Sequence, residues 1–298
     1  MPNTLCHIGL QVPFSRILIA KADLRLIVLA CILPDIPWIC QRLLLKIPFA
    51  DPYPIQLYFI VQASLAWSCL LAAALAVLTS VPGRTFALLA GNCLLHLLLD
   101  ASQIKWANGV HLFAPFDWSM LRFDLFWPEH PLWKMLTLIG IITLAWQWRR
   151  AIFTPLPSLR LNRVRLAAAA SLLLCYLIGP LAFLPLVEAH DNAFLGTLRN
   201  QLERPGKYIE FDRLAYSAEH QQLTTILGEP IRLVGELPAK SGLISVQGRF
   251  ITPDQVMVTR LQQHSSFRDY ASYLGLFMAC ALWLQSVIVA RKRQPLSP

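Results

Sequence analysis

Six long runs of apolar residues limit what this chain can fold into more than any other feature of its sequence. Each run approaches the about 20 residues that a helix needs to cross a bilayer. The runs are Leu26–Leu45, Ile55–Thr79, Phe86–Gln103, Leu132–Trp148, Leu166–Val187 and Tyr270–Ala290. Only 14% of the 298 residues are charged, against about 25% in a typical soluble domain. We therefore expect an all-α polytopic membrane protein with about six transmembrane helices.

The basic residues gather in short connections and therefore bear on orientation. They lie at 149–165, in the tail 291–293 and ahead of the first run at 16–25. Cytoplasmic loops are enriched in Lys and Arg, so six spans place both termini in the cytoplasm. The net charge of +9 is then a topology signal, and we expect no nucleic-acid partner. The apolar stretch Leu5–Ala20 contains Pro13 and Arg16, which favours an amphipathic or re-entrant element over a cleaved signal peptide.

A polar, extracytoplasmic segment interrupts the apolar runs near the C-terminus. After a helical stretch, Val, Ile and Leu alternate with polar residues, which is typical of strands. The strands expected are Tyr208–Phe211, Ile231–Leu237, Leu243–Ile251 and Gln255–Leu261. They predict a meander of three to four strands or a small open barrel. The chain thus divides into a membrane domain at 1–187, a small β-rich domain at 188–269, and a last transmembrane helix with a basic cytoplasmic tail at 270–298.

One apolar run carries ionisable residues on a single helical face. Asn92, His96 and Asp100 are spaced four residues apart, so they stack one turn above another. An ionisable pair inside an apolar helix is costly unless it has a partner, and it therefore indicates function. His96 and Asp100 can both reach one metal ion. The alternative is a hydrogen-bonded pair that only locks helices together.

The first run contains an aspartate between two prolines, Pro34-Asp35-Ile36-Pro37. Each proline removes a backbone donor, and a broken helix is tolerated where it lines a cavity or is buried in protein. From the rise of a helix, Asp35 and His96 lie roughly 15 Å and 18 Å from the same side of the membrane. This similar depth predicts one shared site. The alternative for Asp35 is a helix cap at a kink.

Other histidines extend this candidate site. His111 lies in the aromatic loop that follows the His96 run, where it is either a ligand or proton carrier or else part of an interfacial aromatic belt. His7 reaches the site only if the N-terminal element folds into the membrane. Four further histidines stand in polar segments and are assigned to solvent. They are His130, His190, His220 and His264.

Together these motifs resemble a known family. The segments that carry the resemblance are Cys6-His7-Ile8-Gly9, Leu33-Pro34-Asp35, His96-Leu97-Leu98-Leu99-Asp100 and Gly109-Val110-His111-Leu112-Phe113-Ala114-Pro115-Phe116. They resemble the bacterial membrane-bound metal-dependent hydrolases, which include the LexA-regulated inner-membrane proteins, and more loosely the zinc-dependent phospholipase C enzymes. The resemblance covers about residues 1–150. It implies that His7, Asp35, His96, Asp100 and His111 are metal ligands or catalytic groups, and that the protein lies in the bacterial inner (plasma) membrane.

Two functions of different class follow from these observations. The first is metal-dependent hydrolysis of an ester or phosphoester in a lipid-like substrate, with zinc as the first choice of metal and manganese as the alternative. His111 or Asp117 would then transfer the proton, and membrane lipids would be the surroundings of the site. The second is a non-enzymatic membrane adaptor whose β-rich segment binds an extracytoplasmic protein partner. A transporter is a weaker third option because the runs show no repeat symmetry.

Overall fold

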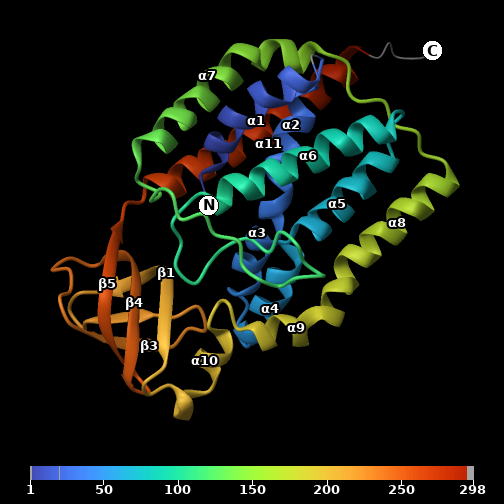
Figure 1. Cartoon of the computed structure of the whole chain (residues 1–298). Coiled ribbons are helices and arrows are strands. Elements are labelled where there is room, and N and C mark those ends of the chain that lie inside the picture. The colour runs from blue at the N-terminus through green and yellow to red at the C-terminus, as the bar shows by residue number, and fades with distance from the viewer. Residues whose placement is uncertain (1, 20, 294–298) are drawn as a thin grey trace.

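The computed structural model describes residues 2–19 and 21–293 and contains a helical part and a β-barrel (Figure 1). The barrel lies at one end of the helical part, between α10 and α11 in the chain. The α-helices are α1 (Thr4–Leu18), α2 (Leu24–Ala30), α3 (Ile36–Leu44), α4 (Pro52–Gln62), α5 (Leu65–Val77), α6 (Pro82–Ala101), α7 (Pro131–Phe153), α8 (Arg163–Ile178), α9 (Leu184–His190), α10 (Leu195–Arg199) and α11 (Phe267–Arg293). Three short 3-10 helices are η1 (Leu33–Asp35), η2 (Gly179–Phe183) and η3 (Gln201–Glu203).

Helix α1 is a core element, and glycines allow its close packing. A Cβ atom at Gly9 would lie 2.0 Å from the Leu136 carbonyl oxygen of α7, and one at Gly140 would lie 2.0 Å from the Leu5 carbonyl oxygen. On another side, a Cβ at Gly275 of α11 would lie 2.8 Å from the Thr4 Cβ. Small residues let helix backbones approach closely, as in membrane helix pairs. The N-terminal element therefore folds into the helical part, and α1 lies beside α7 and α11 (Figure 1).

The prolines around Asp35 divide the first apolar run, as their chemistry predicts. Helix α2 ends at Ala30, η1 covers Leu33–Asp35, and α3 begins at Ile36. Proline cannot donate a backbone hydrogen bond and is favoured in the first turn of a helix. Asp35 therefore occupies the junction between two helical segments. Its side chain is 15% exposed.

The prediction of six transmembrane helices with a small β-rich domain is wrong. Within the described residues, three helical segments are long and apolar enough to span a membrane: Leu24–Leu44, Arg163–His190 and Phe267–Arg293. A fourth is counted only if α4 and α5, which meet at a bend of 68°, form one span. The runs expected at Phe86–Gln103 and Leu132–Trp148 do form α6 and α7, but their polar residues keep both helices below this standard.

This correction also removes the basis for placing both termini in the cytoplasm. That orientation followed from an even number of spans. Three spans would put the two ends of the chain on opposite sides, whereas four would put them on the same side. What the structure supports is narrower: three helices have the length and composition of membrane spans.

The β segment is a closed barrel rather than an open meander. Its five strands are β1 (Tyr208–Ser217), β2 (Gln222–Thr224), β3 (Pro230–Val234), β4 (Gly242–Thr252) and β5 (Gln255–His264). They pair in the order β1-β2-β3-β5-β4, and β4 closes onto β1. All pairs are antiparallel except β3 with β5. Inward-facing residues such as Ile209, Leu223 and Val256 form its own hydrophobic core.

The loop between α6 and α7 joins the barrel to the helical part. Glu210 of β1 accepts hydrogen bonds from the Ala107 backbone N–H at 2.7 Å and from Arg122 Nη1 at 2.9 Å. Burial alone would raise the pKa of the Glu210 carboxyl, but these donors and the Arg122 charge hold it below its usual value. Asn108 adds a bond to Asp212 at 3.2 Å. The loop after α6 is therefore anchored on β1.

Candidate metal centre

Two helices and the break in a third supply the ionisable residues of the candidate site. His7 lies near the start of α1, where Asn3 caps the helix by accepting the Cys6 N–H at 2.9 Å. His96 and Asp100 occupy the last two turns of α6, one turn apart. Asp35 comes from the junction of η1 and α3. The fold therefore brings together residues that are up to 93 positions apart in the chain, counted from His7 to Asp100.

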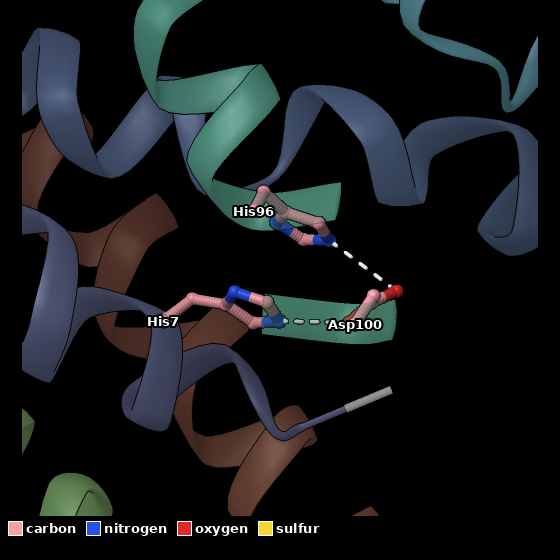
Figure 2. Close-up of side chains that lie close together, drawn as sticks. All are labelled: His7, His96 and Asp100. Carbon is pink, nitrogen blue, oxygen red and sulfur yellow. Dashed lines mark ion pairs between the residues drawn. The ribbon is translucent and has the colours of Figure 1, made fainter. Parts of the chain in front are cut away.

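The four side chains form a compact buried cluster. The distance from His7 Nε2 to Asp100 Oδ1 is 3.4 Å, and that from His96 Nε2 to Asp100 Oδ2 is 3.9 Å. Asp35 joins on one side, with its Oδ1 atom 3.6 Å from His96 Nε2. The two imidazole rings are stacked, with centroids 3.7 Å apart and planes within 4° of parallel. Figure 2 shows both rings presenting a nitrogen toward Asp100.

The unsatisfied atoms of this cluster indicate what it could hold. Both ring nitrogens of His7 and of His96 are buried without a hydrogen-bond partner among the described residues. The same is true of one oxygen each of Asp35 and Asp100. An unmade buried hydrogen bond costs about 1–3 kcal/mol, so several in one place need a physical reason. A bound cation would supply one for the atoms that face each other, because it accepts a lone pair from one nitrogen of each imidazole and from the carboxylate oxygens.

The spacing of the donor atoms agrees with a bound metal ion. Ligands about 2.1 Å from a tetrahedral ion lie roughly 3.4 Å from one another. Ligand atoms of His7, His96 and Asp100 all lie within 4.8 Å of one another. Imidazole nitrogen and carboxylate oxygen suit zinc and manganese. The buried group His7, His96 and Asp100 could therefore hold a metal ion, and Asp35 is placed to complete the set.

Lys105 is a member of the cluster that the sequence did not suggest. Its Nζ atom lies 3.6 Å from Asp100 Oδ2, and its side chain is only 3% exposed. It follows α6 by four residues, so the chain turns back after Asp100 and places an ammonium group beside the ligands. The sequence signal that could have identified Lys105 is its place between two apolar residues in Ile104-Lys105-Trp106. The ammonium group offsets part of the negative charge of the two carboxylates.

The structure places His111 and Asp117 outside this cluster. His111 is not among the residues whose ligand atoms lie mutually within 4.8 Å; its Nδ1 is 3.1 Å from the Trp118 carbonyl oxygen. Burial lowers the pKa of the His111 imidazole to about 4, so the ring is neutral at pH 7. Asp117 is exposed and accepts the Ser119 N–H and hydroxyl, both at 2.8 Å. Their role in proton transfer stays a prediction.

His264, which was assigned to solvent, has a fully buried side chain. Its Nε2 lies 2.8 Å from Ser245 Oγ and its Nδ1 lies 3.1 Å from Glu129 Oε1. This order of serine, histidine and acid matches a hydrolytic triad in residue type. The direction of the hydrogen bonds does not match one. Ser245 donates its only proton to Asp212 at 3.1 Å and already accepts the Arg213 N–H. The hydroxyl therefore has no proton left to give His264, as a triad requires, and the network links the barrel to the helical part.

No family model, curated protein or solved structure matches the chain in the three comparisons with known proteins. The function therefore has to be inferred from the chemistry of the site itself.

Proposed function

We propose that this chain is a membrane-bound, metal-dependent hydrolase that acts on an ester or phosphoester of a lipid-like substrate. The observation that carries the proposal is the buried group of His7, His96 and Asp100, whose donor atoms converge without hydrogen-bond partners in the described chain, with Asp35 Oδ1 3.6 Å from His96 Nε2 beside it. One divalent ion is expected there, with zinc as the first choice and manganese as the alternative. The resemblance of residues 1–150 to the bacterial membrane-bound metal-dependent hydrolases supports the same class and a place in the bacterial inner membrane.

The chemistry follows from the donor set. A divalent ion in such a site supplies Lewis acidity and an activated water at neutral pH. Asp35 and Asp100 orient the histidine nitrogens by charge, and both imidazoles are fully buried, which leaves the Asp35 side as the exposed approach to the cluster. His111 lies in the first half of the loop that begins beside Asp100, and as a neutral imidazole it can accept a proton. Asp117 is the second candidate for that role.

Metal content measured on detergent-purified full-length protein tests the proposal. The native chain is compared with His96→Ala/Asp100→Ala and with a matched control, Glu219→Ala/His220→Ala. The control removes one histidine and one acid from an exposed turn between β1 and β2. About one ion per chain is expected in the native and control proteins and none in the cluster variant, with hydrolysis of chromogenic phosphoesters lost in step. No ion in any of the three, after preparation with zinc and manganese and without chelators, would sink the proposal.

A second candidate is a non-enzymatic adaptor whose cluster is only structural, and Lys105 is the observation that favours it. Its ammonium group can neutralise Asp100 without a metal, so the cluster would act as an ion network that joins α1, α6 and the following loop. The barrel would then bind an extracytoplasmic protein partner. Added zinc separates the two candidates, because only a resident site raises the melting temperature in proportion to the logarithm of the free ion concentration.

A further inference from the structure

A cleft of about 660 Å³ lies where the barrel meets the helical part. Its walls come from α3 and α4, from the loop after α6, from β1 and from the first turns of α11. A smaller cavity of about 80 Å³ adjoins it and reaches Asp35 of the metal cluster. Five residues line both spaces: Trp38, Arg42, Arg268, Asp269 and Tyr273. The cleft and the smaller cavity therefore share one wall, and the smaller cavity brings the cleft next to Asp35 of the cluster.

The charges in this cleft are unevenly satisfied. Its carboxylates are each engaged by a neighbouring donor. The closest such donors are the Ala107 N–H to Glu210 at 2.7 Å, Ser245 to Asp212 at 3.1 Å and Arg213 to Asp269 at 3.2 Å. By contrast, neither Arg42 nor Arg268 has a carboxylate at ion-pair distance in the part of the chain described, and Arg268 Nε is buried without a hydrogen-bond partner. Two guanidinium groups thus remain free in the shared wall.

The surroundings of these arginines place the cleft at the level of lipid headgroups. Tyr270 and Tyr273 stand 73% and 60% exposed in the first turns of α11, which is one of the three candidate spans. Tyr and Trp are enriched where a membrane meets water. Farther along α11, Phe277 and Leu284 are 70% and 62% exposed, as expected of side chains that face acyl chains. A molecule with an anionic head and an apolar tail would match both parts of this surface.

We infer that the cleft binds the phosphate-bearing headgroup of an anionic membrane lipid, which Arg42 and Arg268 hold between Trp38 and Tyr273. Guanidinium groups bind phosphate oxygens in a two-pronged geometry, and the burial of Arg268 Nε strengthens such a contact. The inference deepens the proposed function, since it names the substrate class and delivers a phosphoester to the Asp35 side of the cluster. Headgroup binding itself needs no metal.

Calorimetric titration of the detergent-solubilised full chain with short-chain phosphatidylglycerol and phosphatidylcholine tests this inference. The native protein is compared with Arg42→Gln/Arg268→Gln and with a charge-matched control, Arg232→Gln/Arg260→Gln, which changes two exposed barrel arginines. We expect phosphatidylglycerol to bind at least about tenfold more tightly than phosphatidylcholine, and this preference to vanish only in the cleft variant. Arg42→Lys/Arg268→Lys should restore part of it and shows that the fold tolerates change at both positions.

Two further titrations distinguish lipid binding from binding of free phosphate, and headgroup binding from metal binding. Inorganic phosphate and glycerol 1-phosphate should compete at least about a hundredfold more weakly than the lipid, because they lack the apolar part; equal competition would overturn the lipid assignment. His96→Ala/Asp100→Ala should lose metal and keep the phosphatidylglycerol preference. An unchanged preference in Arg42→Gln/Arg268→Gln would overturn the inference, whereas metal-dependent hydrolysis could still be present and the proposed function would stand.

Discussion

A single methyl group added at Gly9 should empty the metal site without touching any ligand. In Gly9→Ala the new Cβ would lie 2.0 Å from the Leu136 carbonyl oxygen, whereas ordinary contact begins at 3.4 Å. Helices α1 and α7 must therefore separate by about 1.4 Å, which is the difference between these two distances. His7 sits two residues earlier on the same helix, so much of this displacement reaches its imidazole.

The displacement is large compared with the change in ligand distance that a metal site tolerates. Metal–ligand distances tolerate only about 0.2 Å of change, and disturbing the support of a ligand typically costs about 10–100-fold in affinity. We expect Gly9→Ala to weaken zinc binding by at least tenfold. The atoms that the new Cβ would meet are all backbone, so the cost should lie at or above the upper end of the about 1–3 kcal/mol typical of overpacking. The about 1 kcal/mol that exchanging Gly for Ala returns in a helix offsets only part of this loss in the free energy of unfolding.

Gly91→Ala is the matched control for this experiment. Gly91 lies on α6, the helix that carries His96, and a Cβ added there meets nothing within 4 Å. Competition titration against a chromogenic zinc chelator, together with thermal melts, gives the affinity and stability of both variants. Gly91→Ala should bind zinc as the native chain does. The reasoning is refuted if folded Gly9→Ala binds zinc as tightly as Gly91→Ala.

Three further changes probe the surroundings of the site. Lys105→Met removes a positive charge that lies 3.6 Å from Asp100 and repels a bound cation, so it should raise zinc affinity about tenfold in the same titration; a loss of affinity would show that the ammonium group supports the site. Glu210→Gln should lower stability at pH 7 by about 2 kcal/mol. The pKa of Glu210 is lower in the folded chain than in the unfolded chain, where it is about 4.3. Its contribution to stability is therefore present above the unfolded pKa and is lost as the pH falls through the folded pKa. The melting temperatures at pH 7 and pH 3.5 should consequently differ less in the variant than in the native chain. Ser245→Ala should cost about 1–2 kcal/mol in melts yet leave hydrolysis per folded molecule unchanged; abolished hydrolysis would restore the triad that the proton count excludes.

The local part of the candidate site was predictable from the sequence. The spacing of His96 and Asp100 fixes them on one face of α6, and the prolines around Asp35 dictate a break at that residue. Both features depend only on backbone geometry over a few residues. His7 was a candidate only on the condition that the N-terminal element folds into the membrane, since no local pattern places an N-terminal helix inside a bundle.

The count of spans could not be obtained in the same way. Apolar runs register burial but do not distinguish a helix that faces lipid from one that is covered by protein. Helices α6 and α7 carry Asn92, His96 and Thr137 on their buried faces, and polar residues of this kind keep both helices below the hydropathy of a membrane span. Their composition therefore resembles that of weak membrane spans.

Contacts distant in sequence account for the remaining differences. Strand β2 has only three residues, too few for an alternating pattern, and the parallel pairing of β3 with β5 is not encoded by either strand alone. The positions of Lys105 and His264 likewise depend on the loop after α6 docking onto the barrel. Burial of such polar groups is decided by their partners, which a linear pattern does not identify.

X-ray absorption at the zinc edge, on protein loaded with one equivalent of zinc, tests the central claim most directly. A first shell of nitrogen and oxygen at about 2.0–2.2 Å, with the scattering pattern of two imidazoles, is the expected result. The chain also buries the free thiols of Cys6, Cys31 and Cys93, and thiolate is a strong zinc ligand that the spectrum would reveal. A sulfur shell at about 2.3 Å, or a spectrum unchanged in His7→Ala/His96→Ala, would contradict a metal centre built from His7, His96 and Asp100.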